Sequence, residues 1–199
     1  IPFEVDEDVV ERNGTHFHIK DKLFRYWIKY VFQKRLETIE LEPGRLKKEF
    51  KEEVGRAISA FHATSRRDLP TRVTELLSCF DREQLRLQGR RYELPRFEEI
   101  RAVKIRQRSG GAVDALEAQT SEGKWLLVLR KDPMIESDIG AIVEEVRTMP
   151  DRPKRCVIVS LSELDEAARL RALEERMWIW NEPEINALMN LFDKPYIVP

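Results

Sequence analysis

One short segment, Trp125-Leu126-Leu127-Val128-Leu129, constrains the fold more than any other part of the chain. All five residues are apolar, so neither face of an extended segment would carry polar side chains. A strand of this kind lies inside a sheet that is covered on both faces. Cys156-Val157-Ile158-Val159 has the same character. The sequence therefore predicts an α/β domain in which helices cover both faces of a mixed sheet.

The other elements follow from the spacing of apolar residues. A period of two predicts strands at 85–87, 92–95, 100–105, 113–119 and 177–180, and a period of three to four predicts helices within 23–31, 46–61, 73–80, 139–146 and 185–192. Strands 113–119 and 125–131 should be antiparallel neighbours, because Ser121-Glu122-Gly123 between them suits a hairpin loop. Ser, Thr, Asp and Asn are the preferred residues at helix starts, and we expect five helices to begin at Asp21, Thr71, Ser137, Ser162 and Asn181.

The composition divides the chain into an aromatic N-terminal segment and a larger domain. Residues 1–35 hold Phe17, Phe24, Trp27 and Phe32, a segment too small to bury these rings by itself. We expect it to pack as a separate appendage, either on the main domain or on a second copy in a homo-oligomer. Residues 36–45 read as a linker and residues 46–199 as the α/β domain. The chain opens on Ile1 without a methionine, and we expect it to be a segment of a longer protein.

Composition limits the setting of the protein. No apolar run approaches the roughly 18 residues needed to cross a bilayer, so we expect no membrane partner and a cytoplasmic location. The two cysteines, Cys79 and Cys156, each lie in an apolar stretch and are predicted to be free buried thiols, which suits a reducing compartment.

The charge is unevenly distributed along the chain. Its net value is −1, yet residues 45–108 contain 17 Lys and Arg against 10 Asp and Glu, a net charge of +7. Basic stretches attract phosphate backbones, although a solvated surface of mixed sign gives similar counts and is the simpler interpretation. If nucleic acid binds, the candidate residues are Arg90, Arg91, Arg101, Lys104, Arg106 and Arg108.

Several familiar sites are missing from the sequence. Gly123-Lys124-Trp125 lacks the remaining residues of a phosphate-binding Walker A loop. His16 and His18 share one face of a predicted strand without a third ligand, so two exposed histidines are favoured over a metal site. We expect no cofactor in this chain.

One pair of residues suggests metal-dependent phosphodiester chemistry. Asp114 lies on a predicted strand, and Lys131 ends the next, fully apolar strand. Carboxylates at the edge of adjacent strands can hold magnesium, and a nearby lysine can stabilise the charge that develops on the phosphate. The simpler interpretation is that Asp114 forms an ion pair and Lys131 is a solvated strand end.

At these residues the sequence resembles the restriction-endonuclease-like, PD-(D/E)XK fold, in which an Asp strand precedes a Glu-x-Lys strand. Segment 111–116 is similar to the Asp strand and segment 125–131 to the strand that follows. The resemblance implies a three-layer α/β/α domain with catalytic positions at Asp114 and Lys131. Leu129 stands where the family has its carboxylate. A lone aspartate holds magnesium weakly, so the resemblance implies vestigial positions and no metal site.

Segment 17–28 also resembles the end of the winged-helix segment in a prokaryotic family of AAA-type ATPases. In that family a restriction-endonuclease-like domain follows, and segments 92–97 and 180–195 are similar to parts of it. The resemblance implies an ATPase module upstream as the partner of this chain and as the site of ATP.

Three functions remain open from the sequence. The first is a non-catalytic module that binds duplex DNA or regulates an ATPase. The second is an active magnesium-dependent nuclease in which Asp132 or another acid replaces the missing carboxylate; Glu117 is a poor substitute because it should face the other side of its strand. The third is a protein-interaction or oligomerisation domain.

Overall fold

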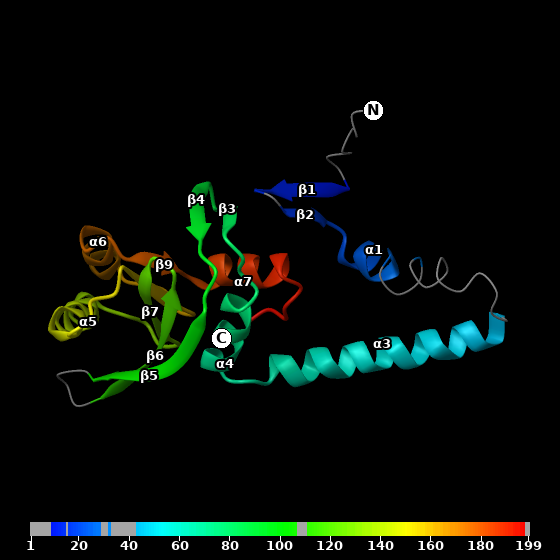
Figure 1. Ribbon diagram of the computed structural model, residues 1–199, viewed down its shortest axis with the longest axis horizontal. Coiled ribbons are helices and arrows are strands. Elements are labelled where there is room, and N and C mark those ends of the chain that lie inside the picture. The colour runs from blue at the N-terminus through cyan, green and yellow to red at the C-terminus, as the bar shows by residue number, and fades with distance from the viewer. Residues whose placement is uncertain (1–8, 15, 29–31, 33–42, 107–110, 198–199) are drawn as a thin grey trace. The chain divides into compact units, whose positions relative to one another are not determined.

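The computed structural model of the chain describes residues 9–14, 16–28, 32, 43–106 and 111–197 (Figure 1). The chain divides into two compact units, Ile1–Arg66 and Arg67–Pro199. Helix α3, Pro43–Ser65, belongs to the first unit, whereas we expected residues 46–65 to open the second domain. Most of the expected linker, 36–42, lies outside the described residues, and the domain limits at 35 and 46 stay predictions.

The first unit contains a short hairpin followed by helices. Strands β1, Val10–Asn13, and β2, His16–Ile19, pair antiparallel. Helix α1, Lys22–Trp27, begins where the sequence predicts, because the side chain of Asp21 accepts a hydrogen bond from the backbone N–H of Phe24 at 3.1 Å. The part of the predicted helix at 29–31 lies outside the described residues.

Aromatic rings form an exposed series in this unit. Phe24 stacks on Trp27 with ring centroids 6.0 Å apart, and Trp27 stacks on Phe32 at 5.8 Å. Phe17 lies under the guanidinium of Arg12 at 5.5 Å. Each of the four rings keeps at least 42% of its surface exposed. The described contacts of the first unit therefore do not bury these rings.

The second unit is built on a five-stranded mixed sheet in the order β5-β6-β7-β8-β9. Its strands are β5 Glu99–Arg106, β6 Ala112–Thr120, β7 Gly123–Arg130, β8 Arg155–Ser160 and β9 Trp178–Trp180. The pairs β5-β6 and β6-β7 are antiparallel, and β7-β8 and β8-β9 are parallel. The predicted antiparallel pairing of β6 with β7 is confirmed.

Both faces of this sheet are covered, as the apolar segment in β7 predicts (Figure 1). Helices α4, Leu69–Leu77, and α7, Glu182–Leu191, cover one face, which we call the α4/α7 face. Helices α5, Glu136–Thr148, and α6, Glu166–Glu174, cover the other, the α5/α6 face. Trp125, Leu127 and Leu129 enter the core of the α4/α7 face, whereas Leu126 and Val128 enter the core of the α5/α6 face. The prediction of a mixed α/β domain is confirmed.

A second, two-stranded sheet lies on the α4/α7 side of the core. Strands β3, Glu83–Leu87, and β4, Arg90–Leu94, pair antiparallel across the two-residue loop Gln88-Gly89. Gln88 and Gly89 have φ angles of 45° and 79°. Two consecutive positive φ values are typical of the turn that matches strand twist in a tight hairpin, and glycine adopts this conformation without steric cost.

Three of the predicted helix starts are wrong. Helix α4 is preceded by Asp68 at its N-cap, not Thr71, and α6 by Asp165, whose side chain accepts from the N–H of Ala167 at 2.7 Å. Helix α5 begins after Ile135, whose N–H donates to the carboxylate of Asp138. The expected starts at Thr71, Ser137 and Ser162 are therefore displaced, and Asn181 is confirmed as the N-cap of α7.

The C-terminal tail is held against the core by side chains from two helices. The Asn186 side chain accepts from the N–H of Ile197 at 2.7 Å and donates to its carbonyl at 3.0 Å. The buried Arg72 donates to the carbonyl of Pro195. These bonds fix the segment after α7 by its backbone, so they do not depend on its side chains.

Two further observations concern the cysteines and the lengths of the helices. Cys79 and Cys156 are both free, as predicted, but each residue is half-buried and not fully buried. The burial of the Cys156 thiol is enough to raise its pKa to about 12. Among the described residues, no helix combines the length and the apolar character that crossing a bilayer requires.

Candidate nucleic-acid interface

Asp114 lies near the start of β6, the second strand of the five-stranded sheet. It lies on β6 and alternates with the buried Val113 and Ala115, so its side chain shares the α4/α7 face with Leu116. Its carboxylate is 54% exposed, and Oδ1 lies 3.9 Å from Nζ of Lys104 on the neighbouring strand β5. Asp114 therefore belongs to an exposed cross-strand ion pair, the arrangement that the simpler interpretation predicts.

Leu129 lies beside Asp114 on the same face. The β6-β7 pairing ends with Ala115 opposite Val128, and Asp114 and Leu129 are the next residues along the two strands, both alternating onto the α4/α7 face. Leu129 is 4% exposed and belongs to the core cluster of the α4/α7 face. A buried apolar side chain thus occupies the position at which the resemblance to the PD-(D/E)XK fold implies a second carboxylate.

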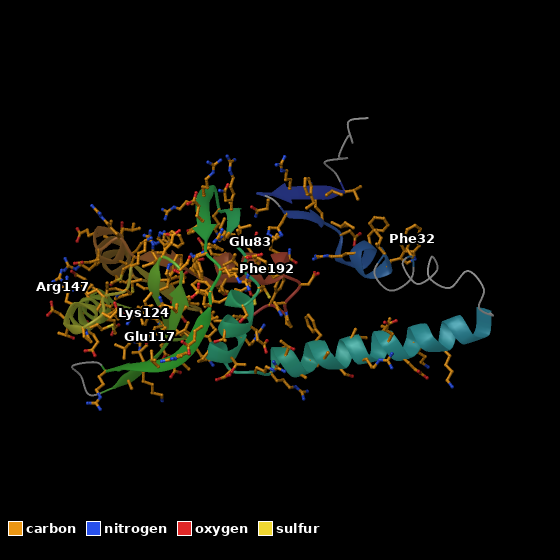
Figure 2. All side chains as sticks on the ribbon, in the orientation of Figure 1. Phe32, Glu83, Glu117, Lys124, Arg147 and Phe192 are labelled. Atoms are coloured by element: carbon orange, nitrogen blue, oxygen red, sulfur yellow. The ribbon has the colours of Figure 1, made fainter. Side chains whose placement is uncertain are left out.

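Neither of the two acids considered as substitutes, Glu117 and Asp132, lies on β6 or β7 on the same face as Asp114. Glu117 lies on the α5/α6 face, where its Oε1 is 3.4 Å from Nζ of Lys124 (Figure 2). Lys131 and Asp132 both follow the end of β7 and are exposed. Lys131 also accepts a hydrogen bond at its backbone carbonyl from the hydroxyl of Ser162. Within the part of the chain that the structure describes, no three His, Cys, Asp or Glu side chains gather closely enough to hold a metal ion.

The five basic candidates that the structure describes are exposed, but they do not all lie on one face. Arg90 and Arg91 lie on β4, and Arg101, Lys104 and Arg106 lie on β5. Lys104 and Arg106 alternate onto the α4/α7 face beside Asp114, whereas Arg101 alternates onto the other face. The Nε of Arg101 donates to the carboxylate of Glu99 at 2.8 Å. The sixth candidate, Arg108, lies outside the described residues.

The two arginines of β4 differ in their surroundings. Burial raises the pKa of the Tyr92 hydroxyl, and the nearby guanidinium of Arg90 opposes the rise. Arg91 points away from the core and is directly opposite Arg86 on β3. Arg86 was not among the basic residues predicted from the sequence. The alternation of Leu85 and Leu87 around it was the signal that it faces outward.

One open cavity of about 280 Å³ lies between α4 and the segment that joins β4 to β5. Its lining includes Thr74, Ser78, Arg96 and Glu98. None of the seven candidate residues that the structure describes lines it. The cavity therefore adds no support to the predicted chemistry.

No family model, curated protein or solved structure matches this chain. The features that bear on function are therefore the buried Leu129 on the same sheet face as Asp114 and the exposed basic side chains on β4 and β5.

Proposed function

We propose that the Arg67–Pro199 unit is a restriction-endonuclease-like domain with a degraded metal site, which binds duplex DNA without cutting it and serves as the C-terminal module of an ATPase. The observation that carries the proposal is Leu129, a buried leucine on the same sheet face as Asp114 and one residue beyond the paired part of β6 and β7. The mixed sheet with both faces covered is the architecture that such a domain requires.

Loss of cleavage follows from the charges around Asp114. Magnesium requires several oxygen ligands and usually binds through carboxylates and water. Asp114 offers one carboxylate, which already faces the ammonium group of Lys104. A metal ion there would have to displace this cation without a second carboxylate from Leu129. We therefore expect neither magnesium nor manganese to support cleavage.

Binding to DNA is supported by Lys104 and Arg106. Both side chains are exposed and lie on one face of β5, the last strand at this side of the sheet. Cations aligned along a strand can contact successive phosphates, and each such contact releases counterions. Asp114 partly offsets their charge, so we expect weak binding with little preference for sequence.

A salt titration tests the DNA-binding half of the proposal. Anisotropy of a labelled duplex should report a dissociation constant that rises steeply with KCl concentration, and the double variant Lys104→Gln/Arg106→Gln should flatten the logarithmic slope by up to about 2. The matched control is Arg152→Gln/Arg169→Gln, which removes two exposed arginines elsewhere in the unit. Binding that ignores salt, or equal slopes in the two double variants, would overturn the assignment to β5.

A plasmid-nicking assay tests the non-catalytic half. The chain should leave supercoiled DNA intact in Mg²⁺ and in Mn²⁺. Metal-dependent nicking that disappears in Asp114→Ala would instead establish the nuclease. If the chain neither binds nor cuts DNA, the protein-interaction function becomes the leading one.

A further inference from the structure

Strand β5 leaves one long edge of the five-stranded sheet open. It is the last strand in the order and runs for 8 residues, whereas β9 at the other edge has 3. Every second residue of β5 therefore directs its N–H and C=O groups away from β6, where the described part of the chain supplies no further strand. An edge of this length can add a strand from another chain.

The charges along this edge make it complementary to a second copy of itself. Glu98 and Glu99 stand at its start, and Lys104 and Arg106 at its end. Charged side chains usually keep edge strands apart, but an acidic start meets a basic end when two copies run antiparallel. Glu99 and Lys104 already have ion-pair partners. Among the described residues Glu98 and Arg106 have none, so both charges are available to a second copy.

A two-fold axis through Ala102 produces this match. Two identical antiparallel strands are related by an axis perpendicular to their sheet, and directly opposed residues then share a face. Centred on Ala102, the register puts this exposed small residue opposite itself and puts Glu98 opposite Arg106 of the other copy, twice. An axis through Arg101 would oppose two like charges. An axis through Val103 would leave Glu98 beyond the end of the second strand.

The open cavity beside α4 is an independent observation at the same place. Its lining includes Glu98 and two hydroxyl side chains of α4, so Glu98 lies on the α4/α7 side of the sheet. Arg106 alternates onto that side as well. In this register the guanidinium of the second copy would stand at the mouth of the cavity, and carboxylate oxygens there could accept its hydrogen bonds. The cavity's own cation, Arg96, faces Asp81 at 4.0 Å.

We propose that two copies of the chain pair antiparallel through β5, in the register centred on Ala102, and that Arg106 of each copy binds Glu98 of the other. The contact joins two five-stranded sheets into one. A single strand pair is smaller than the interfaces that hold stable dimers, so the contact is weak by itself. A first contact through the aromatic rings of the first unit would raise the local concentration of the second strand.

The pairing stands without the proposed function but changes what that function predicts. Arg106 is one of the two cations assigned to DNA, and in the pair it faces a carboxylate of the second copy. Pairing through β5 should therefore compete with DNA for Arg106. This competition, unlike the pairing, rests on the proposed function.

Cysteine cross-linking tests the register. Ala102→Cys places two thiols directly opposite each other, at a Cα separation of about 4.5 to 5.5 Å, which a disulfide spans. Arg101→Cys is the matched control, because the same register puts it diagonal to its own copy at about 7 to 8 Å, too far for a disulfide. Under a mild oxidant Ala102→Cys should form a linked dimer at least about tenfold faster than Arg101→Cys. The wild type controls for the native thiols of Cys79 and Cys156.

Charge reversal in the Ala102→Cys background tests the ion pair. Glu98→Arg and Arg106→Glu each oppose like charges and should slow cross-linking about fivefold or more. The double reversal restores opposite charges and should recover the rate. All of these positions are exposed, and thermal melts check that each variant is folded. Equal rates for Ala102→Cys and Arg101→Cys, or a double reversal no faster than the single ones, would overturn the pairing.

DNA binding separates this inference from the proposed function. The oxidised Ala102→Cys dimer should bind duplex DNA about threefold or more weakly than the same variant when reduced, because a phosphate contact is lost. If the dimer forms as expected and neither form binds DNA, the pairing stands and the proposed function fails. If both forms bind DNA equally well, the competition for Arg106 is wrong.

Discussion

Replacing Leu129 by glutamate should create a metal response that the natural chain lacks. Leu129→Glu puts a second carboxylate beside Asp114 on the α4/α7 face, in the register that pairs Ala115 with Val128. Two carboxylates on adjacent strands, with water, are a plausible ligand set for Mg²⁺ or Mn²⁺. The variant therefore tests whether Leu129 is the reason for the missing metal site.

The cost of this change can be worked out from the burial of Leu129, which is 4% exposed. Losing the burial of a leucine side chain removes about 1.5 to 3 kcal/mol of stability. Placing an unpartnered polar group there removes about 1 to 3 kcal/mol more. We expect Leu129→Glu to lower the free energy of unfolding by roughly 3 to 6 kcal/mol in the absence of metal.

Metal should restore part of this loss. At a concentration 100 times the dissociation constant, a ligand that binds only the folded state adds about 2.7 kcal/mol. For a unit of this size that is a rise of roughly 10 °C in melting temperature. Thermal melts with and without Mn²⁺ would measure it, and the wild type should show no rise.

Two variants serve as controls for this experiment. Leu127→Glu places the carboxylate two residues earlier on the same face of β7, at a residue that is 0% exposed, and should be destabilised without a metal response. Leu129→Glu/Asp114→Asn should lose the response. If folded Leu129→Glu ignores Mn²⁺, or if the wild type gains an Asp114-dependent rise, the account of this site is refuted.

Three further predictions concern other parts of the chain. Asn186→Ala should lower the free energy of unfolding by about 1 to 3 kcal/mol, because two backbone groups of Ile197 lose their partners; an unchanged urea midpoint would contradict it. Cys156 should react with iodoacetamide at pH 8 much more slowly than glutathione does, since burial raises the pKa of its thiol to about 12, and mass spectrometry would follow the reaction; equal rates would refute burial as the cause. The exposed rings of Phe24 and Trp27 should hold the chain as a dimer, so light scattering should give a dimer mass that falls to the monomer in Trp27→Ser; a monomeric wild type would count against this.

The sheet was predictable from the sequence because the pattern of apolar residues along each strand reflects which of its faces are buried. The run 125–129 is apolar throughout because both faces of β7 are covered, and the loop Gln88-Gly89 fixes the β3-β4 hairpin locally. Leu129 was likewise recognisable as the residue that interrupts the predicted metal site, and its position beside Asp114 follows from the register.

Helix starts were less predictable because several residues compete for them. Asp68 and Thr71 are both good N-cap residues, and so are Ser162 and Asp165. Which of them caps depends on where the chain turns to lay its apolar face on the sheet, and this is decided by packing. At α5 no cap residue precedes the helix, and Asp138 reaches back to the N–H of Ile135 instead.

The candidate interface was the least predictable part, because a surface depends on register as well as on charge. The count over residues 45–108 treats Arg101 and Lys104 alike, although they lie on opposite faces of β5 and Arg101 is paired with Glu99. The register of the hairpin decides that the side chains of Arg86 and Arg91 lie opposite each other on the outward face. Charge totals indicate that a polyanion could bind but not which face binds it.

The most direct test of the proposed function is a crystal structure of the chain grown with duplex DNA and Mn²⁺, with anomalous diffraction measured for manganese. We predict a DNA backbone against Lys104 and Arg106, an intact strand, and no manganese peak beside Asp114. A manganese peak that joins Asp114 to a phosphate of the DNA would contradict the account and identify a working nuclease site.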